Sequence, residues 1–334
     1  MCTEWGMRIL AAPDKFKGTA TAHEVATAIA VAAESLGHTA ATVPMADGGE
    51  GTLAALGGAN RTSTVTGPLG EPVEAEWRLD QDRAVIEMAQ ASGLVIAGGR
   101  DGNDPLAATT RGVGELIAEA IDAGAESIIV GVGGSATTDG GLGALEAIGS
   151  VQRLRGIDLR VACDVRTSFV DAAEVFGPQK GASPAQVKML TRRLDVLAET
   201  WVAERGVDVR TLERSGAAGG LAGGLATVGA QLVDGFDVVA ETLGLANAIE
   251  GTDLVITGEG FVDAESFDGK VVGGVLGMAD AAGVPVVAVA GQVFDGADVR
   301  IETISLKEQF GLDRALDDTV ACIAEAVADH LSAR

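Results

Sequence analysis

Lysine is concentrated in this chain beside glycine and acidic residues. Four of the six lysines lie in such clusters, at Lys15 and Lys17 (APDKFKG), Lys180 (FGPQKGAS) and Lys270 (ESFDGK). A lysine next to flexible backbone and a carboxylate can hold phosphate oxygens as a mobile point charge beside a metal ion. Positive charge elsewhere comes mainly from arginine, so lysine is not used here as a general solubilising residue. The pattern indicates phosphate chemistry.

Two of the acidic, glycine-rich loops lie near the N-terminus. The first, PDKFKG, separates an apolar strand from a helix, and backbone amides at a helix start attract anions. The second, ADGGEGT, places two acids around two glycines, which let the backbone approach a ligand closely. Carboxylates in such a loop can hold magnesium or accept a proton from a substrate hydroxyl. The candidate residues of these loops are Asp14, Lys15, Lys17, Asp47, Gly48, Gly49 and Glu50.

Three further loops also combine glycine with acidic, hydroxyl or lysine side chains. GVGGSATTDGGLG (residues 131–143) combines glycines, small hydroxyls and an acid, as phosphate-cradling loops do. CDV and FGPQKGAS add an acid at a strand end and a lysine between glycines. GEGFVDAESFDGK (residues 258–270) puts acids and a lysine in one loop. The candidates are Ser135, Thr137, Thr138, Asp139, Asp164, Gln179, Lys180, Glu259, Asp263, Asp268 and Lys270.

Simpler interpretations exist for each cluster taken alone. Any one of these acids would ordinarily be a solvated loop residue, but five such loops are not well explained by solvation. Residues 131–136 match a dinucleotide fingerprint, yet TTDGG is a poor helix start and no acid ends a strand about 20 residues later. No P-loop, nucleophile elbow or protein-kinase motif set occurs. A kinase with this sequence would therefore have none of those folds.

Hydrophobic periodicity predicts an α/β chain of two domains. The ends of the chain alternate strand and helix, and their polar loops follow the carboxyl ends of strands, where open parallel sheets bind ligands. The middle begins with three short alternating runs typical of an antiparallel meander. We expect a Rossmann- or flavodoxin-like parallel-sheet domain from residues 1–60 plus 245–334, with an inserted mixed α/β domain at 61–244. Expected elements are strands at 7–12, 38–45 and 126–132, and helices at 21–36, 110–123, 184–206, 270–283 and 317–332.

Composition excludes several classes of protein. The formal net charge of −24 and a pI of about 4.4 disfavour nucleic acid or an anionic membrane as partners. The three cysteines form no CxxC pair, and we find neither a signal-peptide pattern nor an apolar run of about 18 residues. We expect a cytoplasmic protein, monomeric or homodimeric. With three histidines and no tyrosine, acid–base chemistry is left to carboxylates, lysine or water.

The ordered motifs resemble one known family over nearly the whole chain. APDKFKG, PMADGGEGT, TGPLG, GSATTDGGLGALEAIG, ACDV, FGPQKGAS, GAAGGLAGG and TGEGFVDAESFDGK, in this order, are similar to the type I glycerate kinase family. The resemblance implies an ATP-dependent kinase that phosphorylates D-glycerate, usually at the 2-hydroxyl, and a two-domain α/β fold. Residues 166–175 depart from the family pattern, which leaves open another small hydroxy acid or sugar acid as the acceptor.

The implied reaction is in-line transfer of the ATP γ-phosphoryl group, catalysed mostly by positioning and charge neutralisation. Magnesium would be held by acids such as Asp47, Glu259 or Asp263. Lys17, with Lys180 and Lys270, would take phosphate oxygens or the substrate carboxylate, and Asp47 or Asp164 would accept the hydroxyl proton. Two alternatives remain at this point: a nicotinamide-dependent dehydrogenase, and a nucleotide-binding regulator without catalysis.

Overall fold

The chain folds into two compact units, described separately here. The structure is a computed structural model and describes residues 6–263, 265–267, 270–294 and 301–334. Unit 1 comprises Met1–Asp47 and Phe236–Arg334, and unit 2 comprises Gly48–Gly235. The sequence interpretation placed these boundaries at residues 60/61 and 244/245. Gly48 and Gly235, where the chain enters and leaves unit 2, approach closely: a Cβ on Gly48 would lie 2.6 Å from Gly235 Cα.

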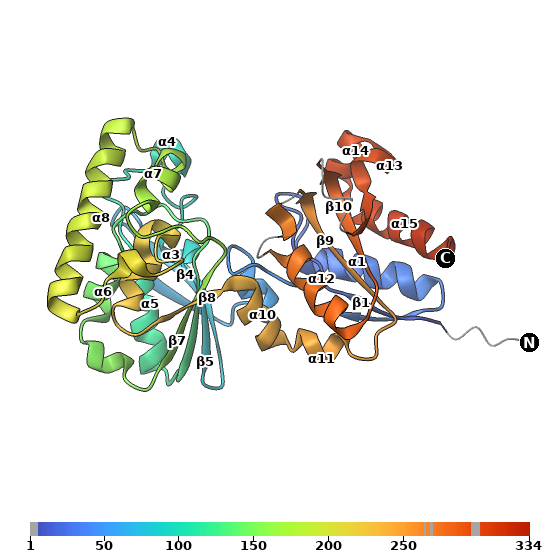
Figure 1. Cartoon of the computed structure of the whole chain (residues 1–334), viewed down its shortest axis with the longest axis horizontal. Helices are drawn as coiled ribbons and strands as arrows, with labels where there is room; N and C mark the ends of the chain where they lie inside the picture. Colours follow the sequence, from blue (N-terminus) through green and yellow to red (C-terminus); the bar gives the residue numbers. More distant parts are fainter. Residues whose placement is uncertain (1–5, 264, 268–269, 295–300) are drawn as a thin grey trace, which may run out of the picture. The chain divides into compact units, whose positions relative to one another are not determined.

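Unit 1 is a parallel sheet between two helical layers (Figure 1). The strand order is β11-β10-β9-β1-β2, and every pairing is parallel. Its elements are β1 (Arg8–Ala11), α1 (Ala22–Ser35), β2 (Thr39–Thr42), α10 (Gly235–Leu243), α11 (Leu245–Ile249), β9 (Leu254–Val262), η5 (Glu265–Phe267), α12 (Val271–Ala282), β10 (Val286–Val293), β11 (Glu302–Ser305), α13 (Leu306–Phe310), α14 (Leu312–Asp317) and α15 (Thr319–Ser332).

Alternation along the strands of unit 1 explains its layers. Successive strand side chains point to opposite faces of a sheet. Val287 and Val289 of β10 pack with α1 and α15, whereas Ala288 and Ala290 pack with Val272 of α12. Both faces of the sheet are therefore apolar, as a buried parallel sheet requires.

Unit 2 is a mixed sheet with strand order β3-β4-β5-β6-β7-β8. The β3–β4 and β4–β5 pairings are antiparallel, which confirms the predicted meander, and β5 to β8 pair in parallel. Its elements are α2 (Thr52–Ala55), β3 (Arg61–Thr66), β4 (Pro72–Asp80), β5 (Arg83–Glu87), α3 (Ala89–Ser92), α4 (Gly99–Gly102), α5 (Arg111–Asp122), β6 (Ser127–Gly131), α6 (Leu142–Ile148), η1 (Val151–Leu154), β7 (Asp158–Cys163), α7 (Ala172–Phe176), η2 (Pro178–Lys180), α8 (Pro184–Arg205), η3 (Val209–Thr211), η4 (Ala217–Gly220), α9 (Leu221–Ala226) and β8 (Gln231–Asp234).

Local sequence signals fix the long helices. Thr21 caps α1 and Ser183 caps α8, each in a capping box with an acid or amide three residues later. Pro184 at the first position of α8 and Gly206 after its end follow the usual placement of these residues. Within the described residues, no helix combines the length and apolar character needed to cross a bilayer.

Helix α8 (Figure 1, yellow-green) packs on unit 2 through one buried stripe. Leu190, Leu194, Ala198 and Trp201 recur at helical spacing and join Phe169 in a separate cluster of buried side chains. The ring centroids of Phe169 and Trp201 lie 5.3 Å apart in an edge-to-face arrangement. This cluster holds the segment that follows β7 against the rest of unit 2.

We predict opposite outcomes for two neighbouring residues of α8. Leu190 has no exposed surface, so Leu190→Ala should lower the free energy of unfolding by about 2–5 kcal/mol. Met189 is 59% exposed, so Met189→Ala should change it by less than about 0.5 kcal/mol. Urea unfolding followed by tryptophan fluorescence measures both, and equal losses in the two variants would contradict the observed burial.

Candidate functional site

In unit 1, polar loops gather at the carboxyl ends of β1 and β9. Asp14 N donates to Gly258 O at 2.8 Å, and Met45 N donates to Pro13 O at 2.9 Å. The loops that follow β1, β2 and β9 are thereby held side by side. The predicted loop residues Asp14, Asp47 and Glu259 come together at this edge, where ligands of parallel sheets bind.

Three carboxylates of these loops repel one another. Asp14 is only 6% exposed, and its pKa is raised to about 7, mainly by burial and further by Asp47 and Glu259, while Lys15 lowers it. The pKa of Glu259 is also raised, mainly by burial, although Ser266 and Lys270 lower it. Burying like charges is costly unless a cation compensates them. The edge therefore favours a positively charged ligand or a metal.

One carboxylate oxygen is left without a partner. Glu259 Oε1 is buried and accepts no hydrogen bond among the described residues. In that part of the chain, no three His, Cys, Asp or Glu side chains form a group that could hold a metal ion. Magnesium usually takes one or two protein carboxylates and completes its shell with water and phosphate oxygens. The residues present fit such an ion arriving with a phosphate compound.

Lysines border the acids of unit 1. Lys15 Nζ lies 3.7 Å from Asp14 Oδ1, and the charge of Lys270 acts on Glu259. Lys17 is exposed in the same turn. A Cβ on Gly260 of β9 would lie 3.4 Å from Lys17 N, so this turn also borders the end of β9. Acids and lysines thus alternate over one small surface.

Asp263 is held in place by a serine that sequence reasoning did not select. Asp263 N donates to Ser266 Oγ and Ser266 N donates to Asp263 Oδ1, both at 3.0 Å. Ser266 is fully buried. Its spacing of three residues from an acid was the available signal, because serine and aspartate often form such local turns. Asp268, another predicted candidate, lies outside the described residues.

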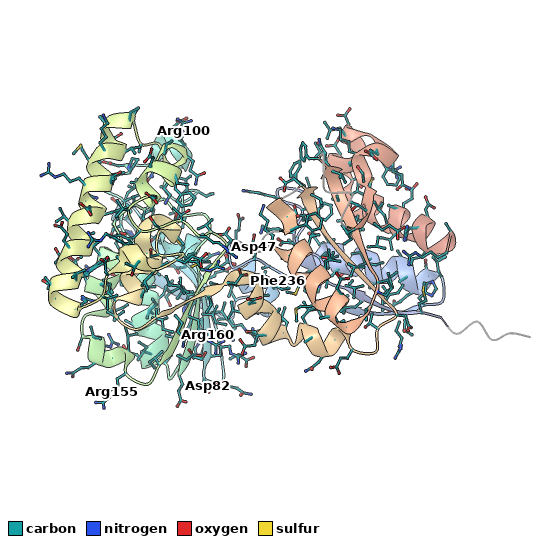
Figure 2. The ribbon with its side chains drawn as sticks, viewed as in Figure 1. Asp47, Asp82, Arg100, Arg155, Arg160 and Phe236 are labelled. Carbon is teal, nitrogen blue, oxygen red and sulfur yellow. The ribbon has the colours of Figure 1, made fainter. Side chains whose placement is uncertain are left out.

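In unit 2, two predicted glycine loops contact each other through their backbones. Val132 N donates to Gly48 O at 3.1 Å. A Cβ on Gly133 would lie 2.7 Å from Gly49 Cα and 2.9 Å from Glu50 N. Only glycine allows this approach, since real side chains do not come so close. The ADGGEG segment also marks the unit boundary, because Asp47 (labelled in Figure 2) ends the first part of unit 1.

Asp139 fixes the glycine-rich loop of residues 131–143 from within. It is 8% exposed, and its carboxylate accepts from the N–H and hydroxyl of Thr110, both at 2.8 Å. It also accepts from the backbone N–H groups of Gly141 and Gly143. These contacts use the carboxylate to join the loop to the start of α5.

Lys180 points into unit 2 instead of toward solvent. Its side chain is 2% exposed, and Nζ donates to Thr137 O at 2.6 Å. Burial lowers its pKa to about 7, although Asp139 acts in the opposite direction. Asn103 Nδ2 donates to both Ala136 O and Lys180 O, at 3.0 and 2.9 Å. Lys180 and Asn103 together clamp the loop, a role that differs from the predicted direct phosphate contact.

The remaining predicted residues of unit 2 differ in exposure. Thr137 and Thr138 are fully buried, and the Thr138 hydroxyl has no partner among the described residues. Ser135 is half-buried, whereas Glu50, Asp164 and Gln179 are exposed. Close by Asp164, Arg214 donates to Cys163 O at 3.1 Å and to Asp234 Oδ2 at 2.9 Å.

Two polar residues that the sequence did not single out are Arg214, in the turn after η3, and Glu87, at the end of β5. Arg214 adopts a φ of 72°, which is unusual for a non-glycine residue. Glu87 is 5% exposed at the end of β5 and accepts from Leu53 N at 2.7 Å. Its position at the end of an apolar run was a signal, because buried acids there require partners.

Comparison with known proteins gives one consistent result. The sequence profile of the glycerate kinase family matches residues 9–152 and 150–331. The chain is 41% identical to glycerate 2-kinase of Escherichia coli K12 over 333 residues, covering 88% of this chain and 87% of the relative. It is 40% identical to glycerate kinase of Bacillus subtilis 168 over 327 residues, covering 86% and 85%. A crystal structure described as glycerate kinase 2 from Salmonella typhimurium LT2 superposes with a TM-score of 0.83 at 36% identity, covering 98% of this chain and 99% of the other.

We predict that Lys180 makes stability depend on pH. Its pKa is about 7 in the folded chain against the ordinary lysine value of 10.5, so between these values the unfolded chain binds more protons. Stability therefore rises with pH across this window and is flat with respect to this group below pH 7. In Lys180→Met this contribution is absent.

Urea unfolding of both proteins at pH 6.5, 8 and 9.5 measures the effect. The difference in unfolding free energy, wild type minus variant, should increase steadily with pH. A difference independent of pH would show that Lys180 is protonated normally in the folded chain.

Proposed function

The chain belongs to the glycerate kinase family and is a kinase, and from this premise we propose that it phosphorylates D-glycerate with ATP to give 2-phosphoglycerate. One observation carries the proposal beyond the family name. Acids lie beside lysines at the carboxyl ends of β1 and β9, where Asp47 and Glu259 raise the pKa of the buried Asp14 and Lys15 lowers it. Phosphoryl transfer needs this combination, because negative oxygens must be neutralised beside a group that can accept a proton.

The acids of unit 1 supply the proton acceptor and the metal ligands. Asp47 orients the glycerate hydroxyl and accepts its proton as the bond to phosphorus forms. Glu259, with an unpartnered oxygen, and Asp263 are the additional ligands for magnesium. When bound, the ion would offset the negative charge of the phosphate oxygens. Asp164, exposed at the end of β7, is the alternative proton acceptor.

The lysines and backbone amides hold the anionic groups. Lys17 and Lys270 bind phosphate oxygens or the substrate carboxylate as mobile cations. In unit 2 the loop of residues 131–143 is held in place before binding by Asp139 and Lys180, and its exposed Gly134 offers backbone to a ligand. Because Lys180 donates to Thr137 O, it supports this loop and leaves direct phosphate contact to others. We further propose that the protein acts in the cytoplasm, as a monomer or homodimer.

The proposed reaction predicts a specific product. In a coupled assay with magnesium, ATP and D-glycerate, ADP release followed by direct conversion of the product by enolase, without added mutase, indicates phosphorylation at the 2-hydroxyl. ADP release without enolase turnover would show transfer to the 3-hydroxyl. Absence of ADP release above background would contradict glycerate as the acceptor, and other small hydroxy acids would then be compared.

Removing the predicted proton acceptor should affect turnover more than binding. Asp47→Asn keeps the size of the side chain but cannot take the proton, so kcat should fall by at least about 100-fold. Lys17→Ala should lower kcat/KM by about 10- to 100-fold, because one cation no longer neutralises the transferred group. Asp82→Asn, an exposed residue of unit 2, is the control. Turnover within about threefold of wild type in either site variant would remove that residue from the mechanism.

A further inference from the structure

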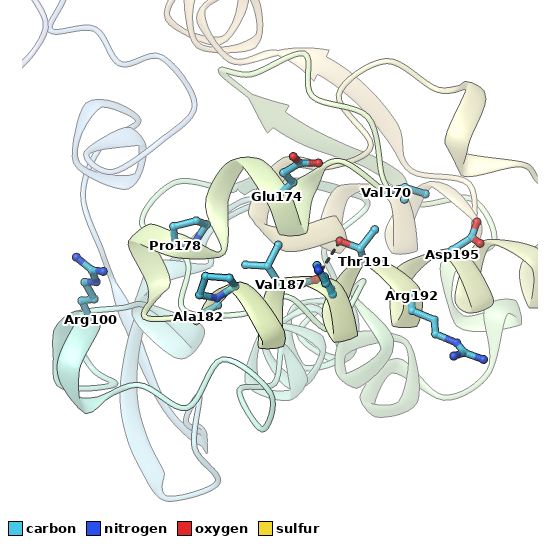
Figure 3. A pocket seen from close by; sticks show the side chains of 11 residues that line it. Arg100, Val170, Glu174, Pro178, Ala182, Val187, Thr191, Arg192 and Asp195 are labelled. Atoms are coloured by element: carbon cyan, nitrogen blue, oxygen red, sulfur yellow. Dashed lines mark hydrogen bonds between the residues drawn. The ribbon is translucent and has the colours of Figure 1, made fainter.

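A groove on unit 2 lies beside the segment that leaves the carboxyl end of β7. Its volume is about 940 Å³, which is of the size that small-molecule pockets in proteins have. Val170, Glu174 and Pro178 from this segment form one wall, and three turns of α8 form the other (Figure 3). Parallel strands place ligand sites beyond their carboxyl ends, so the location is that of a binding groove.

The floor of the groove is apolar and its edges are charged. Val187 lies among Pro178, Ala182 and Thr191 in the middle of the lining. Arg100 and Arg192 lie on either side of it in Figure 3, and Lys188 of α8 also lines the groove. An apolar slot with cations at its edges suits a flat, weakly polar ring that carries an anionic group.

The local charge differs in sign from that of the whole chain. The lining contains three cationic residues and two acidic ones, whereas the chain has 24 Lys and Arg against 48 Asp and Glu. Among the described residues, Arg100, Lys188 and Arg192 form no ion pair. The first turn of α8, which lines the groove through Pro184, adds the partial positive charge of a helix start. The groove is therefore complementary to an anion.

One wall of the groove is formed by a turn that also contacts the glycine-rich loop of residues 131–143. Pro178 and Ala182 line the groove and flank the turn that carries Lys180. Lys180 Nζ donates to Thr137 O at 2.6 Å, and Asn103 connects Lys180 O to Ala136 O. A ligand in the groove would therefore contact the turn that supports residues 136 and 137 through Lys180 and Asn103.

We propose that this groove binds the base and ribose of the donor nucleotide, with Arg100, Lys188 and Arg192 attracting the anionic nucleotide to the groove. The inference rests on the proposed function for the identity of the donor. The apolar floor around Val187 receives the base, and the phosphates extend along the Pro178–Ala182 turn toward residues 133–139.

Two variants test the groove at different points. Lys188→Glu with Arg192→Glu reverses exposed charges, and Val187→Trp fills the floor. Arg83→Glu with Arg155→Glu reverses two exposed charges elsewhere on unit 2 and is the matched control (Arg155 and Arg100 are labelled in Figure 2). Calorimetry with the magnesium complex of a non-hydrolysable ATP analogue measures Kd, and steady-state kinetics measure KM for ATP and for D-glycerate.

The groove variants should raise Kd for the analogue and KM for ATP at least about tenfold, while KM for glycerate and both constants of the control stay within about twofold. If the variants bind the analogue as wild type does, or if wild type does not bind it, the groove proposal is overturned. Groove-dependent binding without turnover of D-glycerate would support the groove and overturn the proposed function. A rise in KM for glycerate alone would assign the groove to the acceptor and overturn the proposal.

Discussion

Repulsion between the buried carboxylate of Asp14 and its partly buried neighbours Asp47 and Glu259 is the constraint on which the proposed chemistry of unit 1 depends. Asp14 is held in the turn after β1 by a backbone bond to β9, and Asp47 and Glu259 raise its pKa further. A protein without a use for this arrangement would replace one acid by an amide, since like charges in a partly buried place lower stability. The arrangement becomes favourable when a cation and its phosphate ligands enter. Lys15 lowers the pKa of Asp14, and Lys270 lowers the pKa of Glu259. Both lysines therefore reduce the repulsion among the acids.

In unit 2, side chains must hold a glycine-rich segment rigid. Glycine gives the loops at residues 48–50 and 131–133 their close approach, but it also costs conformational entropy on folding. The loop of residues 131–143 recovers order through side chains: Asp139 accepts four bonds, and Lys180 and Asn103 hold carbonyl oxygens. Backbone amides that are fixed in advance stabilise developing charge better than mobile ones. The polar residues buried here therefore hold in place the loop that we propose for ligand binding.

The sequence predicted the elements well where the signal was local. Thr21 and Ser183 are capping residues at the expected helix starts, and the meander of residues 61–88 and its turn into a parallel sheet are observed. The order of the motifs predicted the family. Because the chain belongs to that family, the alternative of a dehydrogenase, which rested on the pattern of residues 131–136, is set aside. A short helix does follow that loop at Leu142, although TTDGG alone gave no sign of it, because its first turn is fixed by Asp139 and Thr110.

Contacts between distant segments escaped prediction because no local pattern encodes them. Lys180 looked like a phosphate ligand from its glycine neighbours, yet its direction depends on Thr137, which is 43 residues away. Glu87 and Leu53 are 34 residues apart, and the pairing exists only because α2 begins beside the end of β5. A residue type therefore indicated which chemistry is present, while tertiary packing decided which of these residues face a ligand and which hold the loop in place.

The excess of acid over the whole chain makes the placement of each cation matter. A protein of net charge −24 repels anionic metabolites at long range, and the repulsion is screened within about 10 Å at moderate salt. Binding must then be decided by charges that act inside this distance. Two groups of cations can act within this distance of a ligand. They are the unpaired cations of the groove and the lysines beside Asp14 and Glu259. Their small number is consistent with selective binding, because a broadly basic surface would also attract nucleic acid.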